Sequence, residues 1–479
     1  MWPNRFNIII VTLLALLIRL ISLNQSLWWD EAINVVYARQ SGFLWFITRY
    51  PLGDFHPPGW FALLWSWGNL FGWSEVSVRM PSVLFGVGAV YVTYLIGEKL
   101  FSKKIGLLSA LMLAFAPLHI YYSQEARMYA FGAFAVTFSI YSLVRFIKEE
   151  KYSFMFFALS VALVLYSDYV TYFIFPVLFI YMMCFYRQLM GRFVSSFAFG
   201  IVFFIPWVFI FPDQLMNGQR TALSLLGWGN VVGGSSIKEL ILLPIKVLVG
   251  KVDLYNNFLY VGLIIVTTTP FLITFIKLRK VLDSRYYLIL LWLLVTPILV
   301  WIFSFIIPIF SYFRLLYILP AFYIAVSVCL YRFSKTSFQI LIFFILTFEV
   351  LLSSVYLFNV NYHREDWRGA VQFVDQKMND DSLVIFRNSE IAAPYNYYSR
   401  FLQLAIPAYK VVPVKTKNDI QDLNNVLQGR TQIYLFDYLK DITDPDNILE
   451  TYIEENRFKK ISIDNFNGVG FITTYRKND

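Results

Sequence analysis

The sequence has little cysteine, histidine or charge. It contains two cysteines and three histidines in 479 residues, and charged residues make up only 15% of it. Both cysteines lie within or beside apolar segments, so they indicate neither a disulfide framework nor thiol chemistry. The low charge, with 58% hydrophobic and 19% aromatic residues, excludes an ordinary soluble globule. The net charge of +9 does not indicate nucleic-acid binding, because much of the basic excess lies in short loops between apolar segments.

Long apolar runs recur from residue 6 to about residue 358, which predicts a polytopic α-helical membrane protein. We expect about eleven spans, at residues 6–24, 79–98, 105–121, 128–147, 153–167, 170–186, 194–212, 257–276, 287–307, 314–332 and 338–358. The first is interpreted as an uncleaved anchor, because no clear small-residue cleavage site accompanies its apolar core. A shorter Trp-rich piece at residues 59–72 is expected to lie along the membrane interface.

Basic residues gather in alternate loops, and this pattern predicts the orientation. They are Lys99, Lys103, Lys104, Arg145, Lys148, Lys151, Arg187, Arg192, Lys277, Arg279, Lys280, Arg285, Arg332 and Lys335. The positive-inside rule places these loops and the N-terminus in the cytoplasm. The loops at 25–78 and 213–256 are then outside. We therefore predict a transmembrane domain at 1–360, which carries the candidate site, and an extracytoplasmic domain at 361–479.

The segment 361–479 has the composition of a soluble α/β domain. Strands are predicted at Ser382–Phe386, Lys410–Val414, Gln432–Phe436, Lys459–Ile463 and Gly470–Tyr475, with helices at Asp366–Lys377, Asn418–Leu427 and Ile448–Glu455. This alternation is typical of a small layered sheet. The sequence shows no Gly-rich phosphate loop, nucleophile elbow or metal-ligand cluster here, so we interpret the domain as a substrate-docking or stabilising module.

Two acidic residues follow the first span directly. Asp30 and Glu31 come after Trp28 and Trp29. Partial desolvation by tryptophan raises the pKa of a carboxylate and makes it a better base. The alternative is that the two carboxylates are solvated and cap the next helix.

A third carboxylate returns with a histidine in the same outer loop. Asp54 and His56 precede Pro57 and Pro58, whose rings restrict the backbone after the histidine. They could orient an acceptor or hold a cation, or they could form an ordinary turn. One histidine with scattered carboxylates is weak evidence for zinc.

Further charges lie at the outer rim of the spans. Glu125 and Arg127 could form a structural ion pair or belong to a site, since charges at the membrane rim commonly mark function. Arg19 and Arg314 could snorkel to the headgroups or bind a lipid phosphate through their guanidinium forks. Weaker candidates are Asp168, Arg220, Lys246 and Lys251, whereas Trp367 and Arg368 are expected to pack and cap the docking of the soluble domain.

These motifs, taken together, resemble the C-type (GT-C) glycosyltransferase superfamily. The resemblance rests on the arginine in the first span, Leu27-Trp28-Trp29-Asp30-Glu31-Ala32, His56-Pro57-Pro58-Gly59, Ser74-Glu75, Arg79-Met80-Pro81-Ser82 and Tyr122–Tyr129. It is greatest to the bacterial branch related to dolichyl-phosphate-mannose protein mannosyltransferases and to the aminoarabinose transferase of lipid A. Arg314 with Leu315–Pro320 is similar to that branch's Arg-Tyr-Leu-Leu-Pro stretch. The mannosyltransferases continue their His-Pro-Pro motif with Leu-Gly-Lys, whereas this sequence has Gly59-Trp60-Phe61.

The resemblance implies an integral protein of a bacterial-type cytoplasmic membrane. It also implies transfer of a sugar, with inversion, from a polyprenyl-phosphate donor to an acceptor on the outer face. The first-loop aspartate, Asp30, corresponds to the essential acidic residue, with Glu31 beside it.

The resulting hypothesis is a hexosyl- or pentosyltransferase whose acceptor is a glycan, a lipid or a protein. Asp30 is the expected base, with Glu31, Asp54 and His56 as further catalytic residues. The other expected roles are phosphate binding by Arg314, Arg127 and Arg19, and substrate positioning by Glu125, Tyr129 and Trp29. The chemistry requires no cofactor; if a divalent metal is bound, its expected ligands are Glu31, Asp54, His56 or Glu125. The alternative is a transporter or flippase of lipid-linked sugars, which would more often show internal repeats and ionisable residues near the membrane centre.

Overall fold

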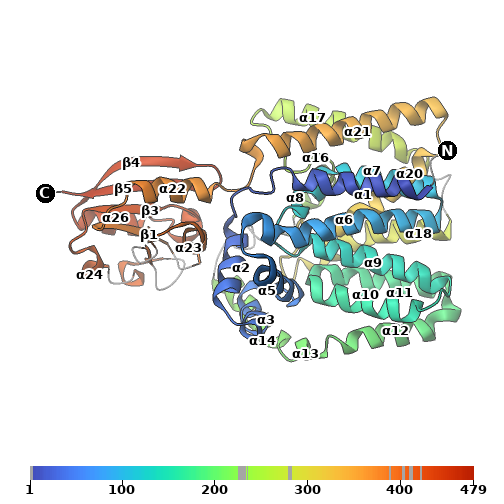
Figure 1. Cartoon of the computed structure of the whole chain (residues 1–479), viewed down its shortest axis with the longest axis horizontal. Helices are drawn as coiled ribbons and strands as arrows, with labels where there is room; N and C mark the ends of the chain where they lie inside the picture. The colour runs from blue at the N-terminus through green and yellow to red at the C-terminus, as the bar shows by residue number, and fades with distance from the viewer. Residues whose placement is uncertain are drawn as a thin grey trace.

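The computed structural model consists of a helical bundle and a smaller sheet domain at one end of it (Figure 1). It describes residues 4–224, 234, 236–278, 283–387, 390–401, 405–408, 414–420 and 423–478. The sheet domain is formed by the C-terminal part of the chain, as predicted from composition. A layer of short helices lies between the two parts (Figure 1).

The bundle is built from apolar helices that run roughly side by side (Figure 1). They are α1 (Asn4–Leu20), α6 (Glu75–Leu100), α7 (Lys103–Phe115), α8 (Pro117–Ser123), α9 (Tyr129–Ile147), α10 (Ser153–Ser167), α11 (Ile174–Phe185), α12 (Met190–Val202), α17 (Asn257–Phe275), α18 (Ser284–Leu290), α19 (Thr296–Phe303), α20 (Leu319–Leu330) and α21 (Lys335–Phe358). The side chains of Ser74, Ser102 and Ser334 accept backbone hydrogen bonds at the starts of α6, α7 and α21. Such caps satisfy amide donors that the first turn of a helix leaves free.

The predicted spans coincide with helices, but the number of eleven is not confirmed. Five helices of the described chain are long and apolar enough to cross a membrane, or up to seven if each of two bent pairs is one span. Three shorter apolar helices, at 7–20, 153–167 and 316–330, match further predicted spans. The predicted span at 194–212 is interrupted, because α12 ends at Val202 and a four-residue helix, α13 (Ile205–Val208), follows.

The segment 25–78, which was predicted as the first outer loop, is helical. It forms α2 (Trp29–Gln40), α3 (Phe43–Thr48), α4 (Pro51–Asp54) and α5 (Gly59–Phe71). The Trp-rich piece expected at the interface is α5, which buries Trp60, Phe61 and Leu64. The second of the predicted outer loops contributes α14 (Phe211–Ser224) and α16 (Ile237–Val249). Helices α2, α3, α5 and α14 lie at the end of the bundle near the sheet domain, whereas α16 lies in the bundle beside α17 (Figure 1).

The C-terminal domain is a five-stranded mixed sheet with helices. Its strands are β1 (Ser382–Phe386), β2 (Ala405–Pro407), β3 (Gln432–Phe436), β4 (Phe458–Phe466) and β5 (Gly470–Lys477), in the order β2-β1-β3-β5-β4. The first three strands are mutually parallel, while β5 runs antiparallel to β3 and β4. The helices are α22 (Trp367–Lys377), α23 (Ala393–Tyr398), α24 (Asn424–Leu427), α25 (Lys440–Thr443) and α26 (Ile448–Glu455).

The predicted elements of this domain are largely confirmed. Strands β1 and β3 have the predicted bounds, and β4 and β5 extend the predicted ones. Strand β2 was not predicted, because a three-residue strand has too short a pattern to recognise. The strand expected at Lys410–Val414 lies, except for its last residue, outside the described residues. Among the described residues of the helix expected at Asn418–Leu427, Asn424–Leu427 form α24, and a short 3-10 helix covers Lys417–Asp419.

Candidate active site

A large cavity opens where the helix bundle meets the C-terminal domain. Its volume is about 1920 Å³, and apolar and aromatic side chains form most of its wall. Its charged lining residues and histidines are Asp30, Arg49, Asp54, His56, Glu125, Arg127, Asp168, Arg220, Lys251, Arg314, His363, Arg364, Glu365 and Glu390. A large cavity at a domain interface, apolar but with converging polar groups, is the expected place for a ligand.

Asp54 is held by several donors at the wall of the cavity. It ends α4, and Phe55 after it has a φ of 64°, in the left-handed region. Arg127 Nη1 donates to it at 2.8 Å, Asn34 Nδ2 donates at 3.3 Å, and His56 Nδ1 lies 2.5 Å from its Oδ1. Burial alone would raise the pKa of Asp54, but Arg127 and His56 outweigh burial and hold that pKa well below its usual range. Asp54 is therefore a fixed anion and a poor proton acceptor.

Asp30 differs because its side chain accepts no hydrogen bond from any described residue. It lies in the first turn of α2, lines the cavity, and keeps 29% of its side chain exposed. Arg127 Nη2 is 3.7 Å from its Oδ2. Burial raises the pKa of Asp30, although Arg127 opposes this shift. An accessible carboxylate with a raised pKa is suited to take a proton from a substrate hydroxyl.

Glu31 is completely buried and does not line the cavity. Arg79 donates to its two oxygens, from Nε at 2.9 Å and from Nη2 at 2.5 Å, and the Ala126 amide donates at 2.7 Å. The same guanidinium donates to the carbonyls of Leu23, Gln25 and Ser26. Glu31 thus ties the start of α2 to the loop before it and to the α8–α9 connection. This geometry fits a positioning role better than the direct catalytic role expected from the sequence.

Glu125 and Arg127, which the sequence analysis considered as a possible ion pair, have different partners. Arg127 pairs with the carboxylates of Asp54 and Asp30, so its charge is largely compensated inside the protein. Glu125 lines the cavity and pairs with Arg364 Nη1 at 2.6 Å, with both side chains 2% exposed. The Arg364 guanidinium also lies 4.3 Å from the centroid of the Tyr121 ring. This buried pair joins the bundle to the first residues after α21.

Four cations of the cavity wall form no ion pair with any described carboxylate: Arg49 and Arg220, which are exposed, and Arg314 and Lys251, which are partly buried. Arg314 Nη1 donates to the Ile309 carbonyl at 3.3 Å. Lys251 Nζ lies 5.3 Å and 5.6 Å from the ring centroids of Tyr121 and Tyr312. Partly buried cations without an anionic partner are suited to an anionic ligand such as a phosphate. The sequence predicted this role for Arg314 and ranked Lys251 low, because a single lysine in a long loop carries no pattern.

Arg19 is completely buried in the bundle and does not line the cavity. It lies beside the break between α7 and α8, where Pro117 follows the end of α7 and the two helices meet at 65°. Proline ends a helix because it lacks an amide donor, and the carbonyls before it need other partners. Arg19 Nη1 donates to the Ala114 carbonyl at 3.1 Å, and its Nη2 lies 2.7 Å from His119 Nδ1. This position fits a structural role better than the expected phosphate binding.

The C-terminal domain also forms hydrogen bonds with Trp29, the residue before Asp30. Glu365 Oε2 accepts hydrogen bonds from the Trp29 amide at 3.1 Å and from Trp367 Nε1 at 2.7 Å, while its Oε1 accepts one from the Tyr438 hydroxyl at 2.8 Å. Burial raises the pKa of Glu365 to about 7. Glu365 and Arg364 are not among the residues predicted from the sequence. The available signal was a pair of charges directly after the last predicted span, at its predicted outer end.

Trp29 and Tyr129, the other residues expected to position a substrate, both line the cavity. Trp29 is held by the C-terminal domain, because its Nε1 donates to the Glu390 carbonyl at 3.0 Å. The ring of Tyr129 packs edge-on against Phe313, with centroids 5.1 Å apart. Tyr129 therefore lies next to the segment that carries Arg314.

The residues expected to hold a divalent metal are not gathered around one point. Within the described ranges, no group of three or more His, Cys, Asp or Glu side chains is arranged to hold a metal ion. Arg79, Arg127 and Arg364 each pair with one of the carboxylates proposed as ligands. These carboxylates are already compensated by cations, so the residues present do not fit a metal at this place.

Comparisons with known proteins agree with this architecture. Residues 55–210 match the family model described as dolichyl-phosphate-mannose-protein mannosyltransferase. The sequence has no match among curated proteins.

Several solved structures share the fold. ArnT from Cupriavidus metallidurans bound to undecaprenyl phosphate is similar with a TM-score of 0.62 and 12% identity, over 98% of this chain and 97% of that chain. Its apo structure gives a TM-score of 0.59 at 12% identity, over the same shares. The archaeal oligosaccharyltransferase AglB from Archaeoglobus fulgidus gives 0.56 at 10% identity, over 96% of this chain and 73% of that chain. Residues 55–210 are therefore similar to this mannosyltransferase family, and the solved structures show that nearly the whole chain shares their fold.

Proposed function

We propose that the protein is an inverting glycosyltransferase that uses a polyprenyl-phosphate sugar donor. The observation that carries this proposal is the arrangement of charges in one cavity: an accessible carboxylate, Asp30, and two partly buried cations without anionic partners, Arg314 and Lys251. A base and a phosphate site are the two elements that such a transfer needs. Solved structures of the same fold contain undecaprenyl phosphate and a dolichol-phosphate, which supports a lipid-phosphate donor.

The proposed reaction is a single displacement at the anomeric carbon. The acceptor oxygen attacks this carbon from the face opposite the phosphate, while Asp30 takes the proton of the acceptor hydroxyl. The bond from the anomeric carbon to the phosphate oxygen breaks, and its electron pair leaves with the polyprenyl phosphate. Arg314 and Lys251 stabilise the negative charge that develops there. One displacement without a covalent intermediate inverts the anomeric configuration.

The neighbours of Asp30 have supporting roles in this proposal. Asp54, His56 and Arg127 form a fixed network that shapes the acceptor side of the cavity. The lipid tail of the donor would leave through an apolar rim, since Phe303 and Ile306 line the cavity and are also exposed on the surface of the protein. Exposed apolar side chains at the mouth of a cavity are suited to a hydrocarbon chain.

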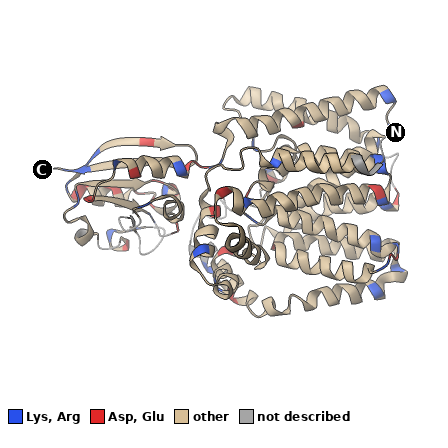
Figure 2. Cartoon of the chain, viewed as in Figure 1, with Lys and Arg blue, Asp and Glu red and all other residues tan. Residues whose placement is uncertain are grey.

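The distribution of charge supports an orientation with the cavity outside the cytoplasm. Lys and Arg gather at the end of the bundle far from the C-terminal domain, and α1 begins at that same end (Figure 2). The positive-inside rule assigns this end to the cytoplasm. The cavity and the C-terminal domain then lie on the extracytoplasmic side of a bacterial-type cytoplasmic membrane.

The decisive experiment compares the wild type with Asp30→Asn in lipid nanodiscs. Radiolabelled polyprenyl-phosphate hexoses and pentoses are supplied one at a time, together with envelope fractions that contain glycans, lipids or proteins. We expect Asp30→Asn to bind the donor as the wild type does and to lose sugar transfer. The matched control is Asp213→Asn, which removes an exposed carboxylate from the first turn of α14 and should leave transfer unchanged.

Two results would contradict the proposal. Undiminished transfer by Asp30→Asn would remove the assigned base. Movement of the intact lipid-linked sugar across a vesicle membrane, with no release of polyprenyl phosphate by the wild type, would identify a transporter. The fraction that becomes labelled identifies the acceptor as a glycan, a lipid or a protein.

A further inference from the structure

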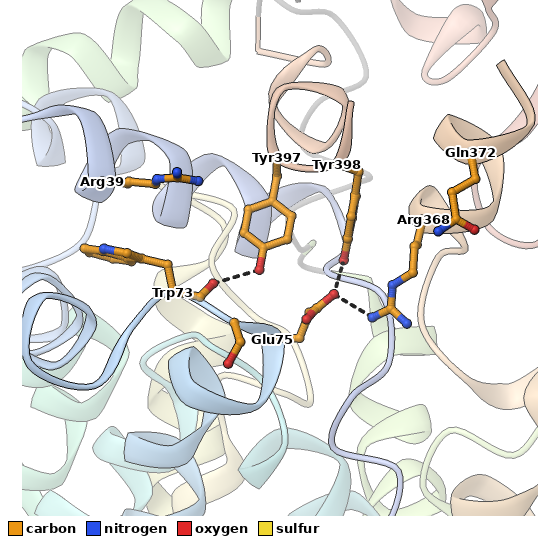
Figure 3. A pocket seen from close by; sticks show the side chains of 8 residues that line it. Arg39, Trp73, Glu75, Arg368, Gln372, Tyr397 and Tyr398 are labelled. Atoms are coloured by element: carbon orange, nitrogen blue, oxygen red, sulfur yellow. Dashed lines mark hydrogen bonds and ion pairs between the residues drawn. The ribbon is translucent and has the colours of Figure 1, made fainter. Parts of the chain in front are cut away.

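A second pocket lies between the outer end of the bundle and the C-terminal domain. Its volume is about 510 Å³, within the range of small-molecule sites. It is formed by the end of α2, the start of α6 and helices α22 and α23, and we call it the α2–α23 pocket. Its lining residues include Arg39, Trp73, Glu75, Arg368, Tyr397 and Tyr398 (Figure 3). None of these residues lines the larger cavity.

The aromatic wall of this pocket is fixed in place by hydrogen bonds. Tyr397 donates its hydroxyl to the Trp73 carbonyl at 2.7 Å. The Tyr398 hydroxyl donates to Glu75 Oε1 at 3.2 Å and accepts the Leu27 amide at 2.8 Å. Because these bonds use the hydroxyl ends of the two tyrosines, the rings keep one orientation without a ligand. A preformed wall lowers the entropy cost of binding.

The pocket carries more positive than negative charge. Arg368 Nη2 is paired with Glu75 Oε1 at 2.6 Å, so these two charges compensate each other. Arg39 is exposed and has no ion pair or hydrogen bond with a described residue. Figure 3 shows its guanidinium and the Trp73 ring on one side of Tyr397, with Arg368 and Gln372 beyond Tyr398 on the other. The helix dipole favours a cation in the last turn of α2, which explains a basic residue there but not the aromatic wall beside it.

We propose that the α2–α23 pocket binds a saccharide unit that carries an acidic group. The C–H face of a sugar ring has a positive edge that packs on the negative face of an aromatic ring, here Trp73 or Tyr397. Planar polar side chains such as Gln372 suit the sugar hydroxyls. The uncompensated guanidinium of Arg39 attracts a carboxylate or phosphate on the same unit.

The position of the pocket indicates which molecule would contain this unit. Asp30 lies in the first turn of α2 and Arg39 in its last turn, so the helix separates them by about 14 Å along its axis. A carbohydrate acceptor whose reacting hydroxyl is at Asp30 could extend toward the α2–α23 pocket. The identification of the saccharide as part of the acceptor rests on the proposed function, whereas binding to the pocket does not.

Binding is tested on the full chain in detergent, without donor. Isothermal titration calorimetry with trigalacturonate as the acidic probe and maltotriose as the neutral probe measures the affinities. We expect the acidic probe to bind more tightly, and Arg39→Met to weaken its binding about tenfold with little effect on the neutral probe. Trp73→Leu should weaken both probes. The matched control, Arg400→Met, removes an exposed arginine of the C-terminal domain outside the pocket and should change neither affinity.

The proposal is overturned if neither probe binds, or if Arg39→Met and Trp73→Leu bind both probes as the wild type does. A second measurement separates it from the proposed function. If transfer to an acidic glycan is found, Arg39→Met should raise the KM for the acceptor and leave donor binding unchanged. Pocket-dependent binding without any sugar transfer would refute the transferase and leave the pocket assignment intact.

Discussion

Removal of the buried Glu31–Arg79 pair should destabilise the protein but leave measurable sugar transfer. The two side chains are 0% and 1% exposed, and Arg79 makes five hydrogen bonds, two to Glu31 and three to backbone carbonyls. At about 0.5–1.5 kcal/mol net for each bond, Arg79→Met should cost roughly 2.5–7.5 kcal/mol. Breaking a buried ion pair by removal of one partner costs about 3–5 kcal/mol, which agrees with that range. Glu31→Ala should cost a similar amount, because it leaves the Arg79 charge uncompensated.

The assay has to separate this positioning role from catalysis. Thermal unfolding in nanodiscs, followed by tryptophan fluorescence, reports stability, and sugar transfer well below the unfolding temperature reports chemistry. We expect Glu31→Gln and Arg79→Met to lower the unfolding temperature and to retain measurable transfer, with a stabilising coupling between the two sites in a double-mutant cycle. An unchanged unfolding temperature with complete loss of transfer by Glu31→Gln would refute this reasoning. Glu31 would then be a catalytic residue.

Three further predictions concern the cavity and the domain contact. Burial raises the pKa of Glu365 from 4.5 to about 7. The contribution of Glu365 to stability is therefore fully present below about pH 4.5 and is lost as the pH rises through 7. Glu365→Gln should flatten the dependence of the unfolding temperature on pH. Arg364→Ala leaves Glu125 buried without its cation and should cost about 3–5 kcal/mol, seen as faster protease cleavage between the two domains; unchanged cleavage would contradict it. Lys251→Met and Arg314→Met should each weaken donor binding about 10- to 150-fold, measured with radiolabelled donor, and unaltered binding would argue against the assigned phosphate site.

Much of the fold could be predicted from the sequence because its signals are local. An apolar run long enough to span a bilayer forms a helix in any fold, since the membrane offers no other partner for its backbone. Strand β3 was located with its exact bounds because all but one of its five residues are buried, as its apolar pattern indicated. The span count was harder, because a proline such as Pro117 bends a helix by an amount that depends on its neighbours.

The sequence by itself determined the helical, apolar character of the bundle and the presence of a C-terminal sheet domain, and it pointed to two acidic residues of the cavity wall. Asp30 and Asp54 were recognised because acidic residues beside tryptophan and proline at a membrane rim are unusual, and both line the cavity. Only the tertiary structure decided which partners charged residues have and whether they line the cavity, even where two of them are adjacent in the sequence. Glu31 lies next to Asp30 but turns away from the cavity to Arg79. Arg19 donates a hydrogen bond to the Ala114 carbonyl at the break between α7 and α8. It also brought Lys251, Arg364 and Glu365 to the same cavity from distant parts of the chain. The physical reason is that the role of a charge depends on which opposite charge lies within a few ångströms and on how much water remains there, and neither is encoded in spacing along the chain.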